Sequence, residues 1–417
     1  MRDPGLRTFL PGGARPCTAM FALFLLVALP AANAYASPSI FPTEVTISVP
    51  NKYQQGFYTL YTSPPDKTVF MIDMDGNVAS TWTNPDGPGT AAIGEVIKPA
   101  PNGGILTYLR VDPNDSKRRR IVELSMTGEI VWEYFNADVP TLNHDFQRLP
   151  NGNVLILGSQ DVLAPQVAPV EIKDDIIFEV NRKKQVVWWW STADHYAQLG
   201  LSDEAKQIIA DREIVPQNNE GDVFHTNSIQ SLPPNPTADA DVRFTKGNIL
   251  VSQRNTNLIF VIDKSTGNIV WKMSGRTVGQ HHVKMIPWPL KGAGNILLFD
   301  NGGWAGYPRK YAFNSRVIEI EPVTKQIVWE YDATLSQNHK RSFFSPFRGS
   351  AQRMPNGNTV ITEAEWGRIF EVTKKGEIVW EYVNPHFKTK GKRGNRIYRG
   401  LRFSQEWLNL DNYKYWW

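Results

Sequence analysis

The chain has 417 residues, of which 41% are hydrophobic, and it carries a formal net charge of +4 at pH 7. Its length allows several small domains or one large repetitive domain, and its composition is ordinary for a soluble globular protein. The nearly balanced charge argues against a nucleic-acid partner, since such proteins carry strongly basic faces.

The first 36 residues have the layout of a secretory signal peptide. Three arginines precede the apolar run CTAMFALFLLVALPAANAYA, which ends in small residues. A membrane anchor, the alternative, needs about 20 apolar residues, and Pro30 interrupts this run too early. We therefore expect cleavage after Ala34 or Ala36, a periplasmic or secreted protein, and no stable membrane insertion. Cleavage removes three Arg, one Asp and the only cysteine, Cys17, which leaves a charge of +2 and no thiol for a disulfide, a metal or a nucleophile.

A unit of strand-like runs is repeated six times along the rest of the chain. Each unit ends in a run with a tryptophan, at Trp82, Trp132, Trp188, Trp271, Trp329 and Trp380. Another alternating apolar run precedes it, as in IFVIDKSTGNIVW, and this pattern predicts two strands joined by a tight turn. Most units begin with a further hairpin, as in HDFQRLPNGNVLILGSQ, with Asn-Gly or Gly-Asn at the turn.

Four short strands per unit, repeated six times, predict an all-β fold: a six-bladed β-propeller with four-stranded blades. A pair of β-sandwiches is the competing architecture. Convincing helical periodicity appears only in LSDEAKQIIADRE, residues 201–213, so we expect a small helical insertion. The expected divisions are the signal peptide (1–36), N-terminal strands leading into the first blade (37–66), the propeller (67–385) and a basic, aromatic tail (386–417).

Strand order places three histidines at one level of the predicted axis. The first strand of each blade lies innermost, and it is the strand before the Asn-Gly turn. His144 lies seven residues before the turn of its unit, while His225 and His281 open the corresponding strands of the next two. Period-2 alternation turns His282 to the opposite side. Arg254 ends the second strand of the His225 unit and is expected at the same mouth.

Three imidazoles and a guanidinium support few kinds of chemistry. Three neutral imidazoles bind zinc with an open position for water, but the adjacent Arg254 would repel a cation. The planar fork of the guanidinium suits a tetrahedral oxyanion instead. One imidazole can act as a nucleophile and another as an acid or base. The residues alone therefore indicate an anion-handling site on the propeller axis.

At these residues the chain resembles the bacterial arylsulfate sulfotransferase family. The resemblance covers about residues 60 to 385, and its most specific motifs are NHDFQRLPNGN, HTNSI, SQRN, GQHH with NILLFDNG, and GSAQRMPNGN. It implies a six-bladed propeller that moves a sulfuryl group from a phenolic sulfate ester to a phenol. The implied mechanism is ping-pong, passes through a sulfohistidine and uses no phosphoadenosine cofactor.

The resemblance also assigns roles to the four predicted site residues. His281 matches the histidine that takes the sulfuryl group, because it stands in GQHH before the FDNG turn. His144 and His225 match the other active-site histidines and Arg254 the arginine; they would bind sulfuryl oxygens and assist protonation of the departing phenolate. His282 receives no role. No metal or organic cofactor is expected, since no nucleotide-binding Gly-rich loop is evident.

Two other functions remain open at this point. IDKSTGNIVW looks like the tryptophan-docking repeat of quinoprotein propellers, but the match is good only once, and the repeated tryptophans are better explained by packing at the rim. A non-enzymatic scaffold would use the histidines only to satisfy backbone groups. In the tail, the basic run KTKGKRGNRIYRGLR is expected to be solvated surface, with an anion-binding arm as the alternative. The oligomeric state and the natural donor and acceptor do not follow from the sequence.

Overall fold

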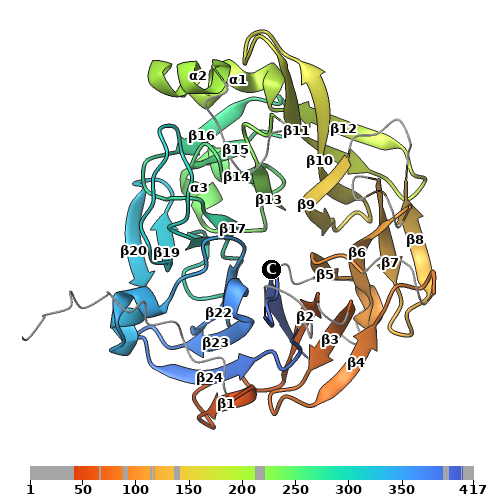
Figure 1. Cartoon of the computed structure of the whole chain (residues 1–417), viewed down its shortest axis with the longest axis vertical. Helices are drawn as coiled ribbons and strands as arrows, with labels where there is room; N and C mark the ends of the chain where they lie inside the picture. The colour runs from red at the N-terminus through yellow and green to blue at the C-terminus, as the bar shows by residue number, and fades with distance from the viewer. Residues whose placement is uncertain are drawn as a thin grey trace, which may run out of the picture. The chain divides into compact units, whose positions relative to one another are not determined.

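The computed structural model describes residues 42–404 and 406, apart from 65–66, 88–92, 113–114, 116–117, 136–140, 212–220, 388–393 and 405. The predicted signal peptide and Cys17 lie outside these residues. Six antiparallel sheets form a ring, with β5, β9, β13 and β17 facing its centre (Figure 1). The predicted six-bladed propeller is therefore confirmed, and the sandwich pair is wrong. None of the described helices is long and apolar enough to cross a membrane.

The strands of each blade run outward from the axis in the orders that follow. The first three blades comprise β25 (Gly400–Ser404), β2 (Phe57–Ser63), β3 (Thr68–Ile72) and β4 (Val78–Trp82); β5 (Ile97–Pro99), β6 (Ile105–Arg110), β7 (Arg119–Leu124) and β8 (Ile130–Tyr134); and β9 (Thr141–Arg148), β10 (Val154–Leu163), β11 (Glu171–Val180) and β12 (Val186–Ser191).

The other three blades follow the same order. They comprise β13 (Thr226–Ser231), β14 (Ile249–Gln253), β15 (Leu258–Ile262) and β16 (Ile269–Met273); β17 (His281–Met285), β18 (Ile296–Asp300), β19 (Arg316–Glu321) and β20 (Gln326–Tyr331); and β21 (Ser350–Arg353), β22 (Thr359–Glu363), β23 (Arg368–Val372) and β24 (Ile378–Val383), with β1 (Glu44–Ser48) added outside β24. The predicted helical run, 201–213, contains α2 (Asp203–Ala210). α1 (Tyr196–Leu199), which was not predicted, precedes it, and α3 (Thr237–Ala240) follows β13.

Asn-Gly turns set the register of the two inner strands in the third and sixth blades. Gly152 and Gly357 both have φ of +91°, a conformation that glycine adopts without the strain that a side chain would bring. Arg148 pairs with Val154 across the first turn, and Arg353 pairs with Thr359 across the second. The turns therefore fix which residues of the innermost strands reach each level of the axis.

The repeated tryptophans join each blade to the next. Trp82 Nε1, in β4, donates to the Ser125 carbonyl of the second blade at 2.8 Å. Trp380 Nε1, in β24, closes the ring on the Met74 carbonyl of the first blade, also at 2.8 Å. Tryptophans in β8, β12, β16 and β20 donate in the same way to the carbonyls of Arg182, Lys264, Pro322 and Lys374. The repeat that marks the fold in the sequence thus makes its blade-to-blade bonds.

The apolar core is divided into six clusters, and each is shared by two neighbouring blades. Between the third and fourth blades, for example, Leu155 and Ile177 pack in one cluster with Val251 and Phe260. Blades covered on both faces need continuous apolar strands, and all five residues of β15 are buried. Buried charged side chains also occur on the innermost strands, where the blades meet the axis, as at Lys98, Asp145 and Lys284.

The N-terminal and C-terminal segments of the propeller lie outside the predicted range, 67–385. Gly400–Ser404, expected in a solvated tail, is the innermost strand of the first blade and pairs with β2. Its Leu401 and Phe403 belong to an apolar cluster, and Arg402 is fully buried, so the basic composition of this run concealed a strand. β1, expected to lead into the first blade, pairs instead with β24 of the sixth.

Candidate active site

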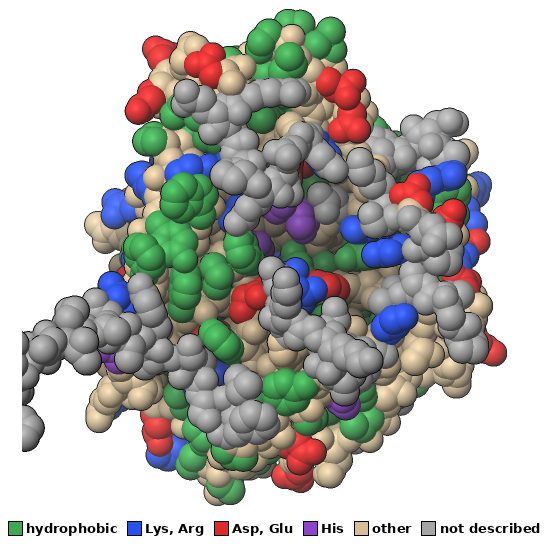
Figure 2. All heavy atoms as spheres, viewed as in Figure 1, with side chains coloured by type: hydrophobic (Ala, Val, Ile, Leu, Met, Phe, Trp, Pro, Cys, Tyr) green, Lys and Arg blue, Asp and Glu red, His purple; other side chains and the backbone are tan. Residues whose placement is uncertain are grey.

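His144, His225 and His281 meet at one end of the axis, from the third, fourth and fifth blades. The ring centroids of His144 and His225 are 4.6 Å apart, and the charges of His225 and Arg254 both act on His281. Figure 2 shows histidine side chains in the hollow at the centre of this face. The structure therefore brings together all four residues singled out in the sequence.

Irregular backbone directs these histidines. His144 and His225 have φ of +44° and +53°, values that are uncommon for residues with a side chain. The pairing of β9 with β10, of β13 with β14 and of β17 with β18 shifts register near the three histidines. Such bulges redirect side chains and are frequent beside active sites. In the fifth blade the positive φ is at His282, +50°, beside His281 rather than at it.

Two acceptors fix the tautomer of His281. Its Nδ1 lies 2.7 Å from Asn301 Oδ1 and 3.0 Å from the Gly279 carbonyl oxygen. The Asn301 amide nitrogen donates to the carbonyls of Ser345 and Arg348, both at 2.7 Å, so its oxygen must face the imidazole. Nδ1 therefore carries the proton and Nε2 keeps the lone pair, 3.4 Å from the Arg348 backbone N–H.

The His281 ring is held in its neutral form. Burial, followed by the positive charge of Arg254, lowers the pKa of His281 well below its ordinary value. The hydrogen bond to Asn301 acts in the opposite direction and is the weaker influence. A neutral imidazole with a lone pair on a known nitrogen is the form that nucleophilic attack requires.

The other two histidines have different partners. His225 Nδ1 lies 2.5 Å from Asp222 Oδ2, a carboxylate that can support a proton on the ring. Burial alone would raise the pKa of Asp222, but the charge and hydrogen bond of His225 lower it overall. His144 Nδ1 lies 3.3 Å from the Tyr398 hydroxyl, and burial with the charge of His225 lowers its pKa. The His225–Asp222 pair is thus suited to carrying a proton, beside a neutral His144.

A second arginine adjoins Arg254. The Arg254 guanidinium donates to Asn255 Oδ1 at 2.9 Å and to the Trp304 carbonyl at 3.0 Å, and it lies over the Phe347 ring. Burial and the charge of Arg309 lower the pKa of Arg254 to about 10. Arg254 Nε and both terminal nitrogens of Arg309 are buried without a hydrogen-bond partner among the described residues. Two neighbouring guanidiniums with unused donors are suited to binding an anion.

Sequence reasoning missed four residues of this site: Asp222, Asn301, Arg309 and Tyr398. Asn301 is the asparagine of the FDNG turn, so the quoted motif contained the signal for it. Asp222 lies three residues before His225 but outside any recognised motif. Arg309 stands in an irregular loop, and Tyr398 stands in the tail that was expected to be solvent-exposed. Their positions depend on contacts between distant segments.

The expectation that His282 faces away from the axis is wrong. The bulge between His281 and Lys284, with φ of +50° at His282, breaks the simple alternation of β17. His282 Nδ1 donates to the Ala351 carbonyl of β21, the innermost strand of the next blade, at 3.1 Å. Both histidines therefore lie near the axis, with different surroundings.

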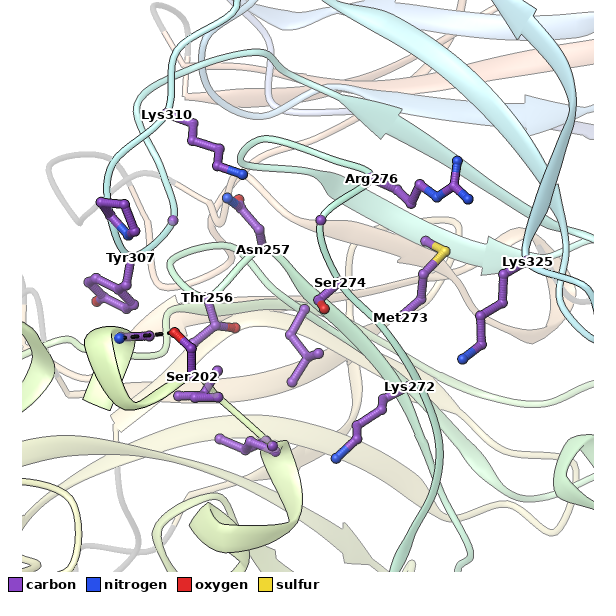
Figure 3. Close-up of a pocket in the computed structure, with 18 of the residues that line it drawn as sticks. Ser202, Thr256, Asn257, Lys272, Met273, Ser274, Arg276, Tyr307, Lys310 and Lys325 are labelled. Carbon is purple, nitrogen blue, oxygen red and sulfur yellow. Dashed lines mark hydrogen bonds between the residues drawn. The ribbon is translucent and has the colours of Figure 1, made fainter. Parts of the chain in front are cut away.

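A cavity of about 720 Å³ lies apart from the histidines, lined by residues of α1, β16 and the loop after β18 (Figure 3). Lys272, Arg276, Lys310 and Lys325 line it, and none of the four predicted site residues does. Among the described residues, no group of three or more His, Cys, Asp or Glu side chains is placed to hold a metal. The histidine cluster remains the better candidate, because it combines a lone pair, a proton carrier and cations in one place.

Comparison with known proteins identifies the family of the chain. A family model described as arylsulfotransferase (ASST) matches residues 111–385, which include all four predicted site residues. No curated protein matches the chain.

Two solved structures are among those similar to the chain. A protein of unknown function from Bacteroides caccae is 14% identical, with a TM-score of 0.51 over 84% of this chain and 99% of that chain. A virginiamycin B lyase from Staphylococcus aureus is also 14% identical, with a TM-score of 0.42 over 84% of this chain and 85% of that chain. At this level of identity, the first structure supports the fold and no particular function.

Proposed function

Because this chain belongs to the arylsulfotransferase family, we propose that it moves a sulfuryl group from a phenolic sulfate ester to a phenol through a sulfohistidine on His281. The observation that carries the proposal is the His281 ring, which is neutral and has its lone pair on Nε2 because Asn301 and Gly279 accept from Nδ1. Family membership supports the reaction class, and the His281 geometry supports the choice of nucleophile.

In the first half-reaction, His281 Nε2 attacks the sulfur of the aryl sulfate. The N–S bond forms as the bond from sulfur to the phenolic oxygen breaks, and the phenolate departs with that electron pair. Arg254 and Arg309 offer donors to the oxygens of the transferred group. His225, supported by Asp222, gives the departing phenolate its proton.

The second half-reaction reverses these roles. An acceptor phenol loses its proton to His225 as its oxygen attacks the sulfur, and the N–S bond breaks to restore neutral His281. His144 lies against His225 and is held by Tyr398, so its part in the proposal is to position the proton carrier and contact the sulfuryl oxygens. The same site thus serves donor and acceptor in turn, as a ping-pong mechanism requires.

The decisive experiment is acid-quenched peptide mass spectrometry after mixing the protein with a chromogenic aryl sulfate and no acceptor. The expected result is one sulfuryl group on the peptide that contains His281, located on that residue. Addition of a phenol should remove the group by transfer to the phenol. An adduct on His144, His225 or His282 would contradict the choice of nucleophile. A protein with neither an adduct nor turnover would favour the scaffold, and bound quinone absorbance would favour the quinoprotein.

The proposal includes export and independence of metals. The first 36 residues motivate export, and a periplasmic form whose intact mass retains residues 1–34 would contradict it. The Arg254–Arg309 pair beside the histidines disfavours a cation at the same place. Exhaustive chelation should therefore leave sulfuryl transfer unchanged, whereas a stoichiometric zinc ion whose removal abolishes turnover would favour the three-histidine metal site.

A further inference from the structure

A second group of charges lies on the axis, on the same innermost strands as the histidines. The Asp145 carboxylate, in β9, lies 3.1 Å from Lys98 Nζ, 3.2 Å from Lys284 Nζ and 3.1 Å from Arg399 Nη1. Lys98 is in β5, Lys284 is in β17 and Arg399 directly precedes β25. All four side chains are buried, Asp145 and Arg399 completely. We call these four residues the axial cluster.

The axial cluster has more positive than negative charge. One carboxylate faces three basic side chains. Burial lowers the pKa of Lys98 well below its ordinary value, and Lys284 and Arg399 alone still exceed the single carboxylate by one positive charge. The Asp145 oxygens are also used by the Ile229 N–H, which donates to Oδ2 at 3.0 Å. No second carboxylate forms an ion pair with Lys98, Lys284 or Arg399 among the described residues. Burying charge without a counter-charge is costly, so an excess of this kind calls for an anion.

Polar atoms without hydrogen-bond partners also lie at the axial cluster. Arg399 Nε and Nη2 are buried and have no hydrogen-bond partner among the described residues, and neither has His282 Nε2. His282 adjoins the axial cluster, because the charges of Arg399, Lys284 and Lys98 add to burial in lowering its pKa. Its Nδ1 is already engaged with the Ala351 carbonyl. Two N–H groups of Arg399 and the Nε2 atom of His282 are therefore available to a bound molecule.

We propose that the axis holds one small monovalent anion of the chloride class, bound by Arg399 and His282 beside Lys98 and Lys284. A water molecule would accept the hydrogen bonds of Arg399, but it would leave the excess charge uncompensated. A halide supplies the charge and accepts hydrogen bonds from several directions. Burial, followed by the charges of Arg399 and Lys284, keeps His282 neutral. An anion against the ring stabilises its protonated form against both influences, so that Nε2 gains a proton and becomes a further donor. The site is distinct from the sulfuryl site, which is built on His281 and Arg254.

The direct test is diffraction from crystals of the full mature protein in which bromide replaces chloride. The expected result is an anomalous peak within hydrogen-bond distance of the Arg399 guanidinium and the His282 ring. Parallel crystals in sulfate without halide should show no tetrahedral density there. Absence of the bromide peak would overturn the proposal, and a tetrahedral anion at the same place would overturn the choice of a halide.

A solution test uses thermal unfolding at constant ionic strength, with chloride replaced by gluconate. An anion that binds only the folded state raises the melting temperature in proportion to its occupancy. The wild-type protein should therefore melt at least roughly 2 °C higher in chloride or bromide than in gluconate. Equal melting temperatures would overturn the proposal, even if crystals showed a bromide peak, because that peak would then reflect binding at crystal concentration only.

Arg399→Gln should abolish the difference between chloride and gluconate, because it removes both a charge and the unused donors. Arg402→Gln is the matched control: Arg402 stands three residues further on, in β25, and is equally buried, but it has its own carboxylate, Glu371. This control should melt lower while keeping the full halide response. If Arg399→Gln does not fold, Lys98→Met should fold and show a weaker halide response, since it removes one of the basic groups beside the anion. An undiminished response in the variant that folds would contradict the proposal.

Discussion

The mouth of the propeller and the axial cluster are built from neighbouring residues, yet they do different things with charge. His144 and Asp145 are adjacent in β9, and His281 and His282 are adjacent in β17. In the axial cluster the carboxylate pairs with three basic side chains. At the mouth the carboxylate, Asp222, is bound to one histidine, and the imidazole of His281 is oriented by an uncharged amide. The placement of the carboxylate therefore separates a structural layer from a chemical one.

The largest effect on activity should come from replacing His281 with alanine, compared with the same replacement at the adjacent His282. His281→Ala should lower kcat/KM for sulfuryl transfer by roughly 10³-fold or more and remove the covalent adduct, because the nucleophile is lost. His282→Ala is the matched control from the adjacent position. It should melt at a lower temperature, since His282 is buried, but retain the adduct and the turnover per folded molecule. Unaltered turnover in His281→Ala would contradict the mechanism.

Asp145→Asn should test the structural layer. The variant should lose about 3–5 kcal/mol of unfolding free energy near neutral pH, because the buried cations Lys284 and Arg399 lose their carboxylate. Urea unfolding measures this loss, and Asp161→Asn, at an exposed position of β10, should change stability by about 0.5 kcal/mol or less. A loss as small as that of the Asp161 variant would show that the axial cations do not depend on Asp145.

The pH dependence of this stability has a definite sign. Burial alone would raise the pKa of Asp145, but Lys284 and Lys98 hold it well below its ordinary value. The stabilisation is therefore fully present above the ordinary aspartate pKa and is lost as the pH falls through the lowered value. The difference between wild type and Asp145→Asn should accordingly shrink only in acid.

Substitution of Arg254 separates its charge from its shape. Arg254→Lys should lower kcat/KM by about 10²-fold, because a point charge does not reproduce the planar fork of donors. Arg254→Met should lower kcat/KM at least as much and should also move the acidic limb of its pH profile upward. The limb moves because the Arg254 charge helps to keep the pKa of His281 low. An upward shift of similar size in Arg254→Lys would contradict this account.

The smallest effect should come from the tail. Tyr398→Phe removes the hydroxyl that contacts His144, and one such hydrogen bond corresponds to roughly a 3- to 10-fold loss in kcat/KM. Tyr61→Phe, which removes a buried hydroxyl bonded to Tyr382 in an apolar cluster, should leave kcat/KM unchanged. Equal activities of the two variants would remove Tyr398 from the site.

The sequence was sufficient for whatever depends on local pattern. Alternation, Asn-Gly turns and the repeated tryptophan predicted six blades, and the phase of the strands placed His144, His225 and His281 together. It was insufficient where contacts between distant segments or an irregular backbone determine the position of a residue. The pairing of Gly400–Ser404 with β2 joins residues more than 300 positions apart, and the bulge at His282 overrides alternation. Arg309 owes its position to a loop whose path no local pattern encodes.

Ring closure by β25 makes the order of synthesis matter. The ribosome delivers the N-terminal blades first, and the blades from β5 to β20 can form their tryptophan bonds early. Tyr398 and Arg399, one at the mouth and one in the axial cluster, arrive only with the last segment. A nascent or shortened chain that ends before them can hold its nucleophile without the residues that complete either layer. In the proposed mechanism, reactivity toward sulfate esters is therefore coupled to synthesis of the segment that contains Tyr398 and Arg399.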